Sequence, residues 1–105
     1  MSSIFTKIIN REIPSEIVFE LDNIIVIKDI YPRAKTHLLI IPKKEIISVD
    51  HITYEDKDLI FEMFLVAKKL AKDLGIEGSY QLHFNVGKDG GQEIMHLHMH
   101  LMSDK

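Results

Sequence analysis

The sequence HLHMHLM at residues 96–102 gives the clearest indication of the fold of this chain. Histidine alternates with leucine or methionine along it, which is typical of a half-buried β-strand. Successive side chains of a strand point to opposite faces, so we expect His96, His98 and His100 to share one face, about 6.6 Å from one to the next. The leucines and methionines then share the other face and supply the burial that fixes the register.

The residues before this stretch predict four more strands. Residues 80–86 alternate in the same way, and a short glycine-rich segment, GKDGG at 87–91, joins them to the histidine stretch. A connection this short makes the two strands antiparallel neighbours. Three β-branched runs predict the remaining strands, at residues 17–20, 24–27 and 38–41, and the first two of them form a hairpin.

The centre of the chain has a helical period instead. Between residues 59 and 74 apolar side chains recur at steps of three and four, which places them on one stripe of a helix. Thr53 is the predicted N-cap, with Asp56 in the capping-box position, and Gly75 stands where a C′ glycine ends a helix. The sequence therefore predicts an α+β fold with five antiparallel strands and one long helix, in a single domain over residues 1–105.

The composition excludes several classes of protein. Because the chain has no cysteine, it has no disulfide, thiolate nucleophile or cysteine-ligated metal site. Thirteen basic and sixteen acidic residues give a net charge of −3 with both signs scattered, which argues against a polymeric nucleic acid as partner. The N-terminus lacks the apolar stretch of a signal peptide, and no apolar run approaches the ~20 residues of a membrane span. We therefore expect a cytoplasmic protein that does not associate with membranes.

The row of histidines has three interpretations. The first is a solvated polar face, although chance rarely places three histidines there without a lysine, glutamate or threonine. The second is a metal site, but His96 and His100 would stand ~13 Å apart along a strand, too far to reach one ion at ~2.0–2.1 Å. His37 or Asp29 would have to complete such a site. The third, which we favour, is covalent catalysis at phosphorus, with no metal and no cofactor.

In this third interpretation the central histidine, His98, is the nucleophile. A neutral imidazole has one lone-pair nitrogen and one N–H, and its ordinary pKa of ~6.5 keeps it mostly neutral at neutral pH. One neighbouring histidine can orient His98 through its second ring nitrogen, and the other can donate to phosphoryl oxygens. The glycine-rich segment 87–92 lets backbone N–H groups approach a phosphate and is the candidate anion cradle.

Residues 96–102 resemble the His-φ-His-φ-His-φ-φ signature of the histidine-triad superfamily, where φ is an apolar residue. Gly-Gly-Gln at 90–92 resembles a segment of its nucleotide-binding, Hint-type branch, and residues 4–14 and 36–44 resemble the opening and middle motifs of that branch. The resemblance spans nearly the full chain. It implies a five-stranded antiparallel sheet with one long helix and a short N-terminal helix, paired into a homodimer with a continuous sheet.

The same resemblance implies hydrolysis of a purine nucleoside phosphoramidate, or a related AMP-like nucleotide derivative, through a nucleotidyl-histidine intermediate. By motif position His98 resembles the nucleophile, His96 the residue that orients it, and His100 the residue that meets the phosphate. His37 resembles a further histidine that lines the phosphate site. The substrate-binding positions match Asp29 and Ile30 on the ribose side, and Asn85, Gly91, Gln92 and Glu93, with His98 and His100, on the phosphate side.

Two departures from the family pattern concern the leaving group. Glu93 stands where several family members have Ser or Thr, so we expect its side chain either to point away from the phosphate or to protonate the departing amine. Residues 103–105 stand where family members often begin a Gly-Gly-Arg-like tail that shapes the leaving-group pocket. His51 and His83 fall outside the motifs, and we expect structural roles for both.

Two other functions stay open on the sequence alone. Dinucleoside polyphosphate hydrolysis is a second activity within the superfamily. A nucleotide-binding interaction protein without catalysis is a rival from a different class.

Overall fold

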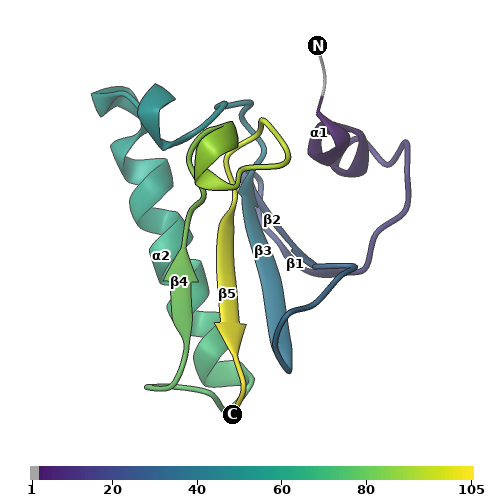
Figure 1. Cartoon of the computed structure of the whole chain (residues 1–105), viewed down its shortest axis with the longest axis vertical. Helices are drawn as coiled ribbons and strands as arrows, with labels where there is room; N and C mark the ends of the chain where they lie inside the picture. Colours follow the sequence, from purple (N-terminus) through teal and green to yellow (C-terminus); the bar gives the residue numbers. More distant parts are fainter. Residues whose placement is uncertain (1–2) are drawn as a thin grey trace.

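The computed structural model describes residues 3–105 and contains one five-stranded antiparallel sheet with helices on both of its faces (Figure 1). The strand order is β1-β2-β3-β5-β4, so β1 and β4 are the edges. This confirms the fold class predicted from the sequence. In chain order the elements are α1 (Ile4–Ile9), β1 (Ile17–Glu20), β2 (Ile24–Lys28), β3 (Thr36–Pro42), η1 (Val49–His51), η2 (Tyr54–Asp56), α2 (Lys57–Asp73), β4 (Gln81–His83), η3 (Lys88–Gly90) and β5 (Met99–Ser103), where η marks a short 3-10 turn.

Alternation along the central strands divides the buried side chains into two cores. In β2, Ile24 and Val26 belong to the core under the long helix α2, whereas Ile25 and Ile27 belong to the core under the short helix α1. The same alternation runs along β3. All four of these β2 side chains are buried, because both faces of the central strands are covered. The sheet face that carries the histidines is therefore partly covered by α1 and only partly open to solvent.

The helix α2 forms as the sequence predicts, except that its N-cap is Asp56, whereas the predicted N-cap, Thr53, caps the preceding 3-10 turn η2. The backbone N–H of Thr53 donates to Oδ2 of Asp56 at 2.9 Å at the start of the 3-10 turn η2. This turn continues directly into α2. Gly75 follows the helix with a φ of +75°, a conformation in which glycine carries no side-chain penalty. Among residues 3–105, no helix is long and apolar enough to cross a membrane.

The last two strands are shorter than predicted. β5 begins at Met99 rather than at residue 96, and β4 ends at His83 rather than at residue 86. The reason is that the two segments separate beyond the paired residues His83 and His100. The backbone N–H of Leu97 donates to the carbonyl of Ile46 at 2.6 Å and does not continue the β-ladder with β4. The alternation of side chains nevertheless continues, since Leu97 lies in the core under α2 with Met99.

Candidate active site

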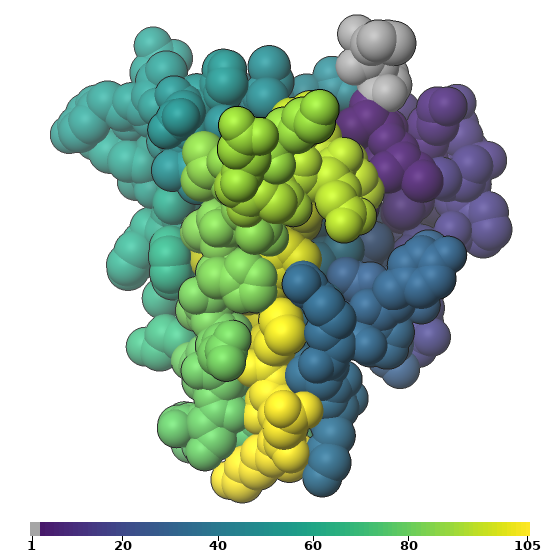
Figure 2. Space-filling model, viewed as in Figure 1, coloured from purple at the N-terminus to yellow at the C-terminus, as the bar shows by residue number. Residues whose placement is uncertain are grey.

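A cavity of about 770 Å³ opens between α1, the sheet and the loop that joins β4 to β5. In the space-filling view the yellow-green end of this loop meets the purple N-terminal residues, with the blue segment between β2 and β3 below them (Figure 2). One side of the cavity is apolar and includes Phe5, Ile8 and Leu39. Its polar lining residues include Asp29, Arg33, Asn85, Glu93, His98 and His100, and Gly91 lines it as well.

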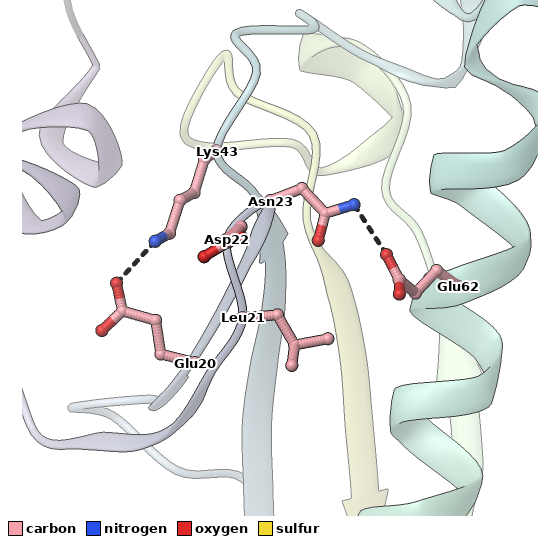
Figure 3. A pocket seen from close by; sticks show the side chains of 6 residues that line it. All are labelled: Glu20, Leu21, Asp22, Asn23, Lys43 and Glu62. Carbon is pink, nitrogen blue, oxygen red and sulfur yellow. Dashed lines mark hydrogen bonds and ion pairs between the residues drawn. The ribbon is translucent and has the colours of Figure 1, made fainter.

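A second hollow, between the β1–β2 turn and α2, does not have this character (Figure 3). Its polar groups are largely satisfied by one another, because Lys43 pairs with Glu20 at 2.7 Å and Asn23 donates to Glu62 at 2.6 Å. None of its lining residues is a histidine. We therefore locate the candidate active site in the cavity that contains His98 and His100.

His98 lines the cavity in a defined tautomer. Its Nδ1 lies 2.7 Å from the carbonyl oxygen of His96, and a carbonyl can only accept, so Nδ1 carries the hydrogen. The lone pair is then on Nε2, the nitrogen that a nucleophile requires. The Phe5 ring packs edge-on against the imidazole, with centroids 5.0 Å apart. Burial lowers the pKa of His98 below its ordinary value of 6.5, so the ring is neutral at neutral pH.

His96 is buried and does not line the cavity. Its Nε2 lies 2.8 Å from the carbonyl oxygen of Pro42 and therefore donates, while its Nδ1 accepts from the hydroxyl of Ser3 at 2.7 Å. The same hydroxyl caps α1 by accepting from the backbone N–H of Thr6 at 3.1 Å. The sequence predicted that a neighbouring histidine would orient His98 through its second ring nitrogen. In the structure the backbone carbonyl of His96 contacts that nitrogen, Nδ1, while the ring of His96 anchors the segment to α1.

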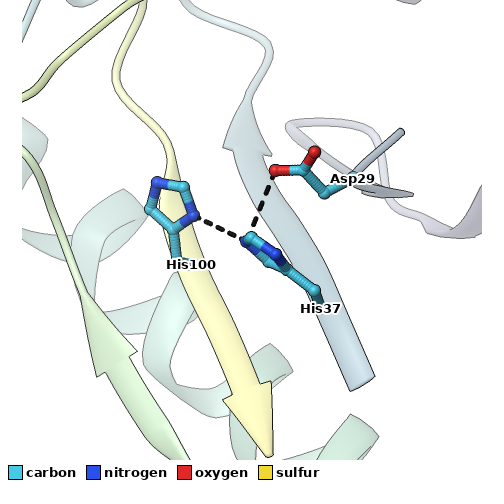
Figure 4. Close-up of side chains that lie close together, drawn as sticks. All are labelled: Asp29, His37 and His100. Carbon is cyan, nitrogen blue, oxygen red and sulfur yellow. Dashed lines mark hydrogen bonds and ion pairs between the residues drawn. The ribbon is translucent and has the colours of Figure 1, made fainter. Parts of the chain in front are cut away.

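Asp29, His37 and His100 form a second hydrogen-bonded group (Figure 4). The backbone N–H of Arg33 donates to Nδ1 of His37 at 3.1 Å, so the hydrogen of the His37 ring is on Nε2. That N–H donates to Nδ1 of His100 at 2.9 Å, and Oδ2 of Asp29 lies 3.4 Å from the same nitrogen. The hydrogen of neutral His100 is therefore on Nε2, where it is a donor available to the cavity.

His100 is neutral at neutral pH. Burial, followed by the neighbouring histidines and Arg33, lowers the pKa of His100 from 6.5 to about 3. Burial is also the main cause that lowers the pKa of His37. His37 was expected to line the phosphate site, but its side chain is fully buried behind His100 and does not line the cavity. It contacts the cavity-lining residues His100, Asp29 and Arg33 from behind.

The same three side chains have the composition of a metal site, since their ligand atoms all lie within 4.8 Å of one another. The hydrogen bonds do not fit that role. A metal on Nε2 of His37 would need the ring hydrogen on Nδ1, where the backbone N–H of Arg33 already donates. Asp29, His37 and His100 therefore fit a hydrogen-bonded relay better than a set of metal ligands.

The residues expected to contact the ribose lie at the cavity mouth. Asp29 follows β2 directly, and its Oδ1 accepts from the backbone N–H of Tyr31 at 2.8 Å, which fixes the turn. Ile30 is 78% exposed, so an apolar side chain stands open at the mouth. A carboxylate beside an exposed apolar residue can accept from ribose hydroxyls while the sugar and base cover the apolar surface.

The glycine-rich loop is held in shape from inside by Gln92. Its Oε1 accepts from the backbone N–H of Gly87 at 2.9 Å, and its Nε2 donates to the carbonyls of Ile47 at 2.7 Å and Ile94 at 3.0 Å. Gln92 is therefore buried and, unlike its neighbours Gly91 and Glu93, does not line the cavity. Its contribution is to fix the backbone that faces the cavity.

Gly91 has a structural reason to be glycine. Its φ is +88°, and a Cβ at this position would lie 3.2 Å from Nδ2 of Asn85. Asn85 lines the cavity and donates from Nδ2 to the carbonyl of Gly90 at 3.0 Å. The amide and the loop thus form one unit, beside which Glu93 is exposed.

Two features of the site were not predicted from the sequence. His83, for which we expected a structural role, stacks on the ring of His100 with centroids 4.4 Å apart and planes 13° apart. Arg33 lines the cavity from the β2–β3 loop, where no periodic pattern marks it. The predicted pairing of the two last strands was the sequence feature that could have placed His83 beside His100.

His51 is exposed, and its Nδ1 is hydrogen-bonded to the hydroxyl of Ser48 at 2.9 Å. It does not line the cavity.

The chain resembles known proteins over nearly its full length. The family model described as "Scavenger mRNA decapping enzyme C-term binding" matches residues 2–105. The purine nucleoside phosphoramidase of Escherichia coli (strain K12) is 44% identical over 104 residues, which cover 98% of this chain and 87% of that protein. A HIT family hydrolase from Legionella pneumophila Philadelphia 1 superposes with a TM-score of 0.96 at 44% identity, covering 99% of this chain and 94% of the other. A histidine triad nucleotide-binding protein from Candida albicans gives a TM-score of 0.85 at 36% identity, covering 95% and 73%.

The fold, and the histidines clustered beside a glycine-rich loop, are those expected of a histidine-triad protein, and the similar proteins fall in the same class. The chain belongs to the histidine-triad superfamily.

Proposed function

We propose that this chain hydrolyses a purine nucleoside phosphoramidate, or a related AMP-like derivative, through a nucleotidyl intermediate on His98. The chain is a nucleotide-binding hydrolase of the histidine-triad superfamily, in keeping with its similarity to the Escherichia coli phosphoramidase and to the HIT hydrolases. One observation supports the specific reaction most strongly: in a single cavity, His98 has a lone pair on Nε2 and His100 has a hydrogen on Nε2. A neutral nucleophile beside a fixed donor suits displacement at a charged phosphoryl group.

In the first step Nε2 of His98 attacks the α-phosphorus. A bond forms between that nitrogen and phosphorus, while the bond from phosphorus to the leaving amine breaks and its electron pair goes to the amine nitrogen. The positive charge that develops on the imidazole is stabilised at Nδ1–H by the carbonyl of His96. The N–H of His100 donates to a phosphoryl oxygen as negative charge concentrates there.

In the second step water attacks the phosphorus of the nucleotidyl-histidine. The bond between phosphorus and Nε2 breaks and the electron pair returns to His98. The nucleoside monophosphate leaves with the oxygen from water, and the proton that this water loses passes to the Glu93 carboxylate. Both steps use the same donors, so the loop does not need to rearrange between them. Splitting one difficult displacement into two easier ones is the advantage of the covalent route.

The remaining cavity residues bind the nucleotide in this proposal. Asp29 accepts from the ribose hydroxyls and Ile30 covers the sugar, while the apolar side of the cavity holds the purine. Asn85 and the backbone of Gly91 contact the phosphate. Gln92 and His37 act from behind as positioning residues, because neither lines the cavity.

Glu93 is assigned to the leaving group. Its side chain is exposed at the cavity, where an ionised carboxylate would repel the phosphate but suits contact with an amine. In this role Glu93 meets the substrate as the protonated carboxyl, delivers that proton to the departing nitrogen in the first step and is left as a carboxylate. Its neutral counterpart, Glu93→Gln, keeps the size of the side chain and removes that proton source.

We also propose that the chain forms a homodimer. β4 is an edge strand with unpaired backbone groups on its outer side, and the neighbouring helix α2 exposes Phe61, Phe64 and Leu65. An apolar helix face next to an open sheet edge suits the continuous sheet expected from the family resemblance. Sedimentation at micromolar concentration tests this proposal. The cytoplasmic location expected from the sequence stays a prediction.

The experiment for the proposed reaction compares the wild type with His98→Ala on adenosine 5′-phosphoramidate. We expect His98→Ala to lose turnover while AMP binding, measured by calorimetry, stays detectable. A parallel assay on a diadenosine polyphosphate measures the rival activity. Full turnover by His98→Ala would refute the nucleophile, and wild-type turnover no faster than the variant's, with AMP still bound, would favour a non-catalytic nucleotide-binding protein.

A further inference from the structure

His83 is the histidine beside the cavity that the proposed mechanism leaves without a role. It is the last residue of β4 and pairs with His100 across the sheet. Its ring lies almost parallel to the His100 ring, with centroids 4.4 Å apart and an interplanar angle of 13°. The His83 ring is half-buried and does not line the cavity. Any effect on the reaction must therefore act through His100.

The surroundings of the His100 ring show what this stack contributes. His37 contacts one edge of the ring, by donating to Nδ1 at 2.9 Å. His98 lies at 5.1 Å with its plane tilted by 60°, so it does not cover a face of the ring. His83 does cover a face, and it does so from β4, the edge strand next to β5. Without the His83 ring, that face of His100 would be open to water.

We propose that His83 is a positioning residue for the reaction, which holds the His100 ring in the orientation that presents its Nε2–H to the phosphoryl group and keeps water from that ring. The inference rests on the proposed function, in which His100 is the donor. A hydrogen bond at Nδ1 alone leaves the ring free to tilt about that bond, and a parallel stack removes this freedom. The two contacts together fix the ring.

The charge state of the cluster agrees with this role. The titratable and charged groups around His83 are His100 and His98 from the last segment, His37 from β3 and Arg33 from the β2–β3 loop. Burial, and then the charge of Arg33, lower the pKa of His83, so its ring is neutral at neutral pH. Burial is also the largest cause of the lowered pKa of His100, and the His83 ring supplies part of that burial.

Removing the ring of His83 has a directional consequence. Water that reaches His100 raises its pKa, because hydration favours the charged form. A protonated His100 carries hydrogen on both nitrogens and can no longer accept from His37. The relay then breaks on mild acidification, and activity declines at a higher pH than in the wild type.

The test uses two substitutions with opposite expectations. His83→Ala removes the stack, whereas His83→Phe keeps a planar ring in its place and removes only the ring nitrogens. We expect His83→Ala to lower kcat on adenosine 5′-phosphoramidate about tenfold, the upper range for one aromatic contact, with KM changed less than about twofold. We expect His83→Phe to restore kcat to within about threefold of the wild type. His51→Ala, a matched loss of an exposed histidine, is expected to leave both constants unchanged.

Two further readouts separate positioning from a merely structural role. The acid limb of kcat/KM is expected to move to higher pH in His83→Ala and not in His51→Ala. In ¹⁵N spectra the His100 ring is expected to show the Nε2–H tautomer in the wild type and in His83→Phe, and averaged or protonated signals in His83→Ala. Should His83→Ala fail to fold, His83→Leu takes its place, since leucine fills volume without a planar face.

The inference is overturned if the variant without the ring matches the wild type in kcat, in its pH profile and in the His100 spectrum, whether or not its melting temperature falls. Loss of activity in His83→Phe equal to that in His83→Ala would also overturn it, because the stack would then not be the cause. Failure of the proposed function is a separate result: the wild type itself would not turn over the phosphoramidate, while the spectra would still report the stack.

Discussion

Gln92 offers a direct prediction about what keeps the glycine-rich loop in shape. The substitution Gln92→Met preserves the length of the side chain and removes all three of its hydrogen bonds, to Gly87, Ile47 and Ile94. At about 1 kcal/mol net for each bond, the free energy of unfolding should fall by ~3 kcal/mol. That is a large part of the 5–15 kcal/mol typical of a domain of about this size.

Urea denaturation at fixed protein concentration measures this loss. With a slope of ~1–3 kcal/mol per molar urea, the midpoint should fall by roughly 1–3 M while the slope stays constant. Gln81→Met is the matched control, because Gln81 is exposed on β4, and its change should stay within about 0.5 kcal/mol. The kcat/KM for the phosphoramidate should fall only in Gln92→Met. Equal midpoints for the two variants would show that the three hydrogen bonds of Gln92 do not stabilise the fold.

Three further predictions follow from single contacts. Gly91→Ala should lower the free energy of unfolding by ~1–2 kcal/mol and raise KM, because the φ of Gly91 is +88° and the new Cβ would lie 3.2 Å from the amide of Asn85. Gly90→Ala is the control in the same kinetic assay, because a Cβ at Gly90 has open space around it. Ser3→Ala should lower the melting temperature and kcat, since it removes both the cap of α1, worth ~1 kcal/mol, and a bond to His96; unchanged melting and kinetics would contradict the coupling. Because the pKa of His100 is lowered from 6.5 to about 3, the unfolded chain takes up a proton that the folded one does not, and stability should fall as the pH decreases from about 6.5 towards 3. His100→Gln should flatten that part of a melting curve series, and an identical pH dependence would argue against the lowered pKa.

The parts of this structure that depend on local pattern could be predicted from the sequence. Alternation assigned Leu97 and Met99 to one face and the histidines to the other, and the structure confirms that assignment even where the strand has not begun. The three-and-four spacing and Gly75 likewise predicted α2 and its end. These features follow from backbone geometry over a few residues, so a single sequence carries them.

The contacts that set the chemistry could not be predicted in this way. The ring of His96 is anchored by Ser3 and by Pro42, which are distant along the chain. The tautomer of His100 depends on the backbone N–H of Arg33, transmitted through His37. Each of these contacts is a meeting of separate elements in the folded chain, and periodicity within one element contains no information about it.

In the proposed reaction Nε2 of His98 becomes bonded to phosphorus during turnover. The most direct measurement mixes the wild type with an adenosine phosphoramidate, quenches the reaction within its first turnovers without acid, because phosphoramidate bonds are acid-labile, and maps the modified peptide by mass spectrometry. We expect an adenylyl group on His98 that decays as AMP accumulates. Turnover with no adduct at His98, or with an adduct on another residue, would contradict it.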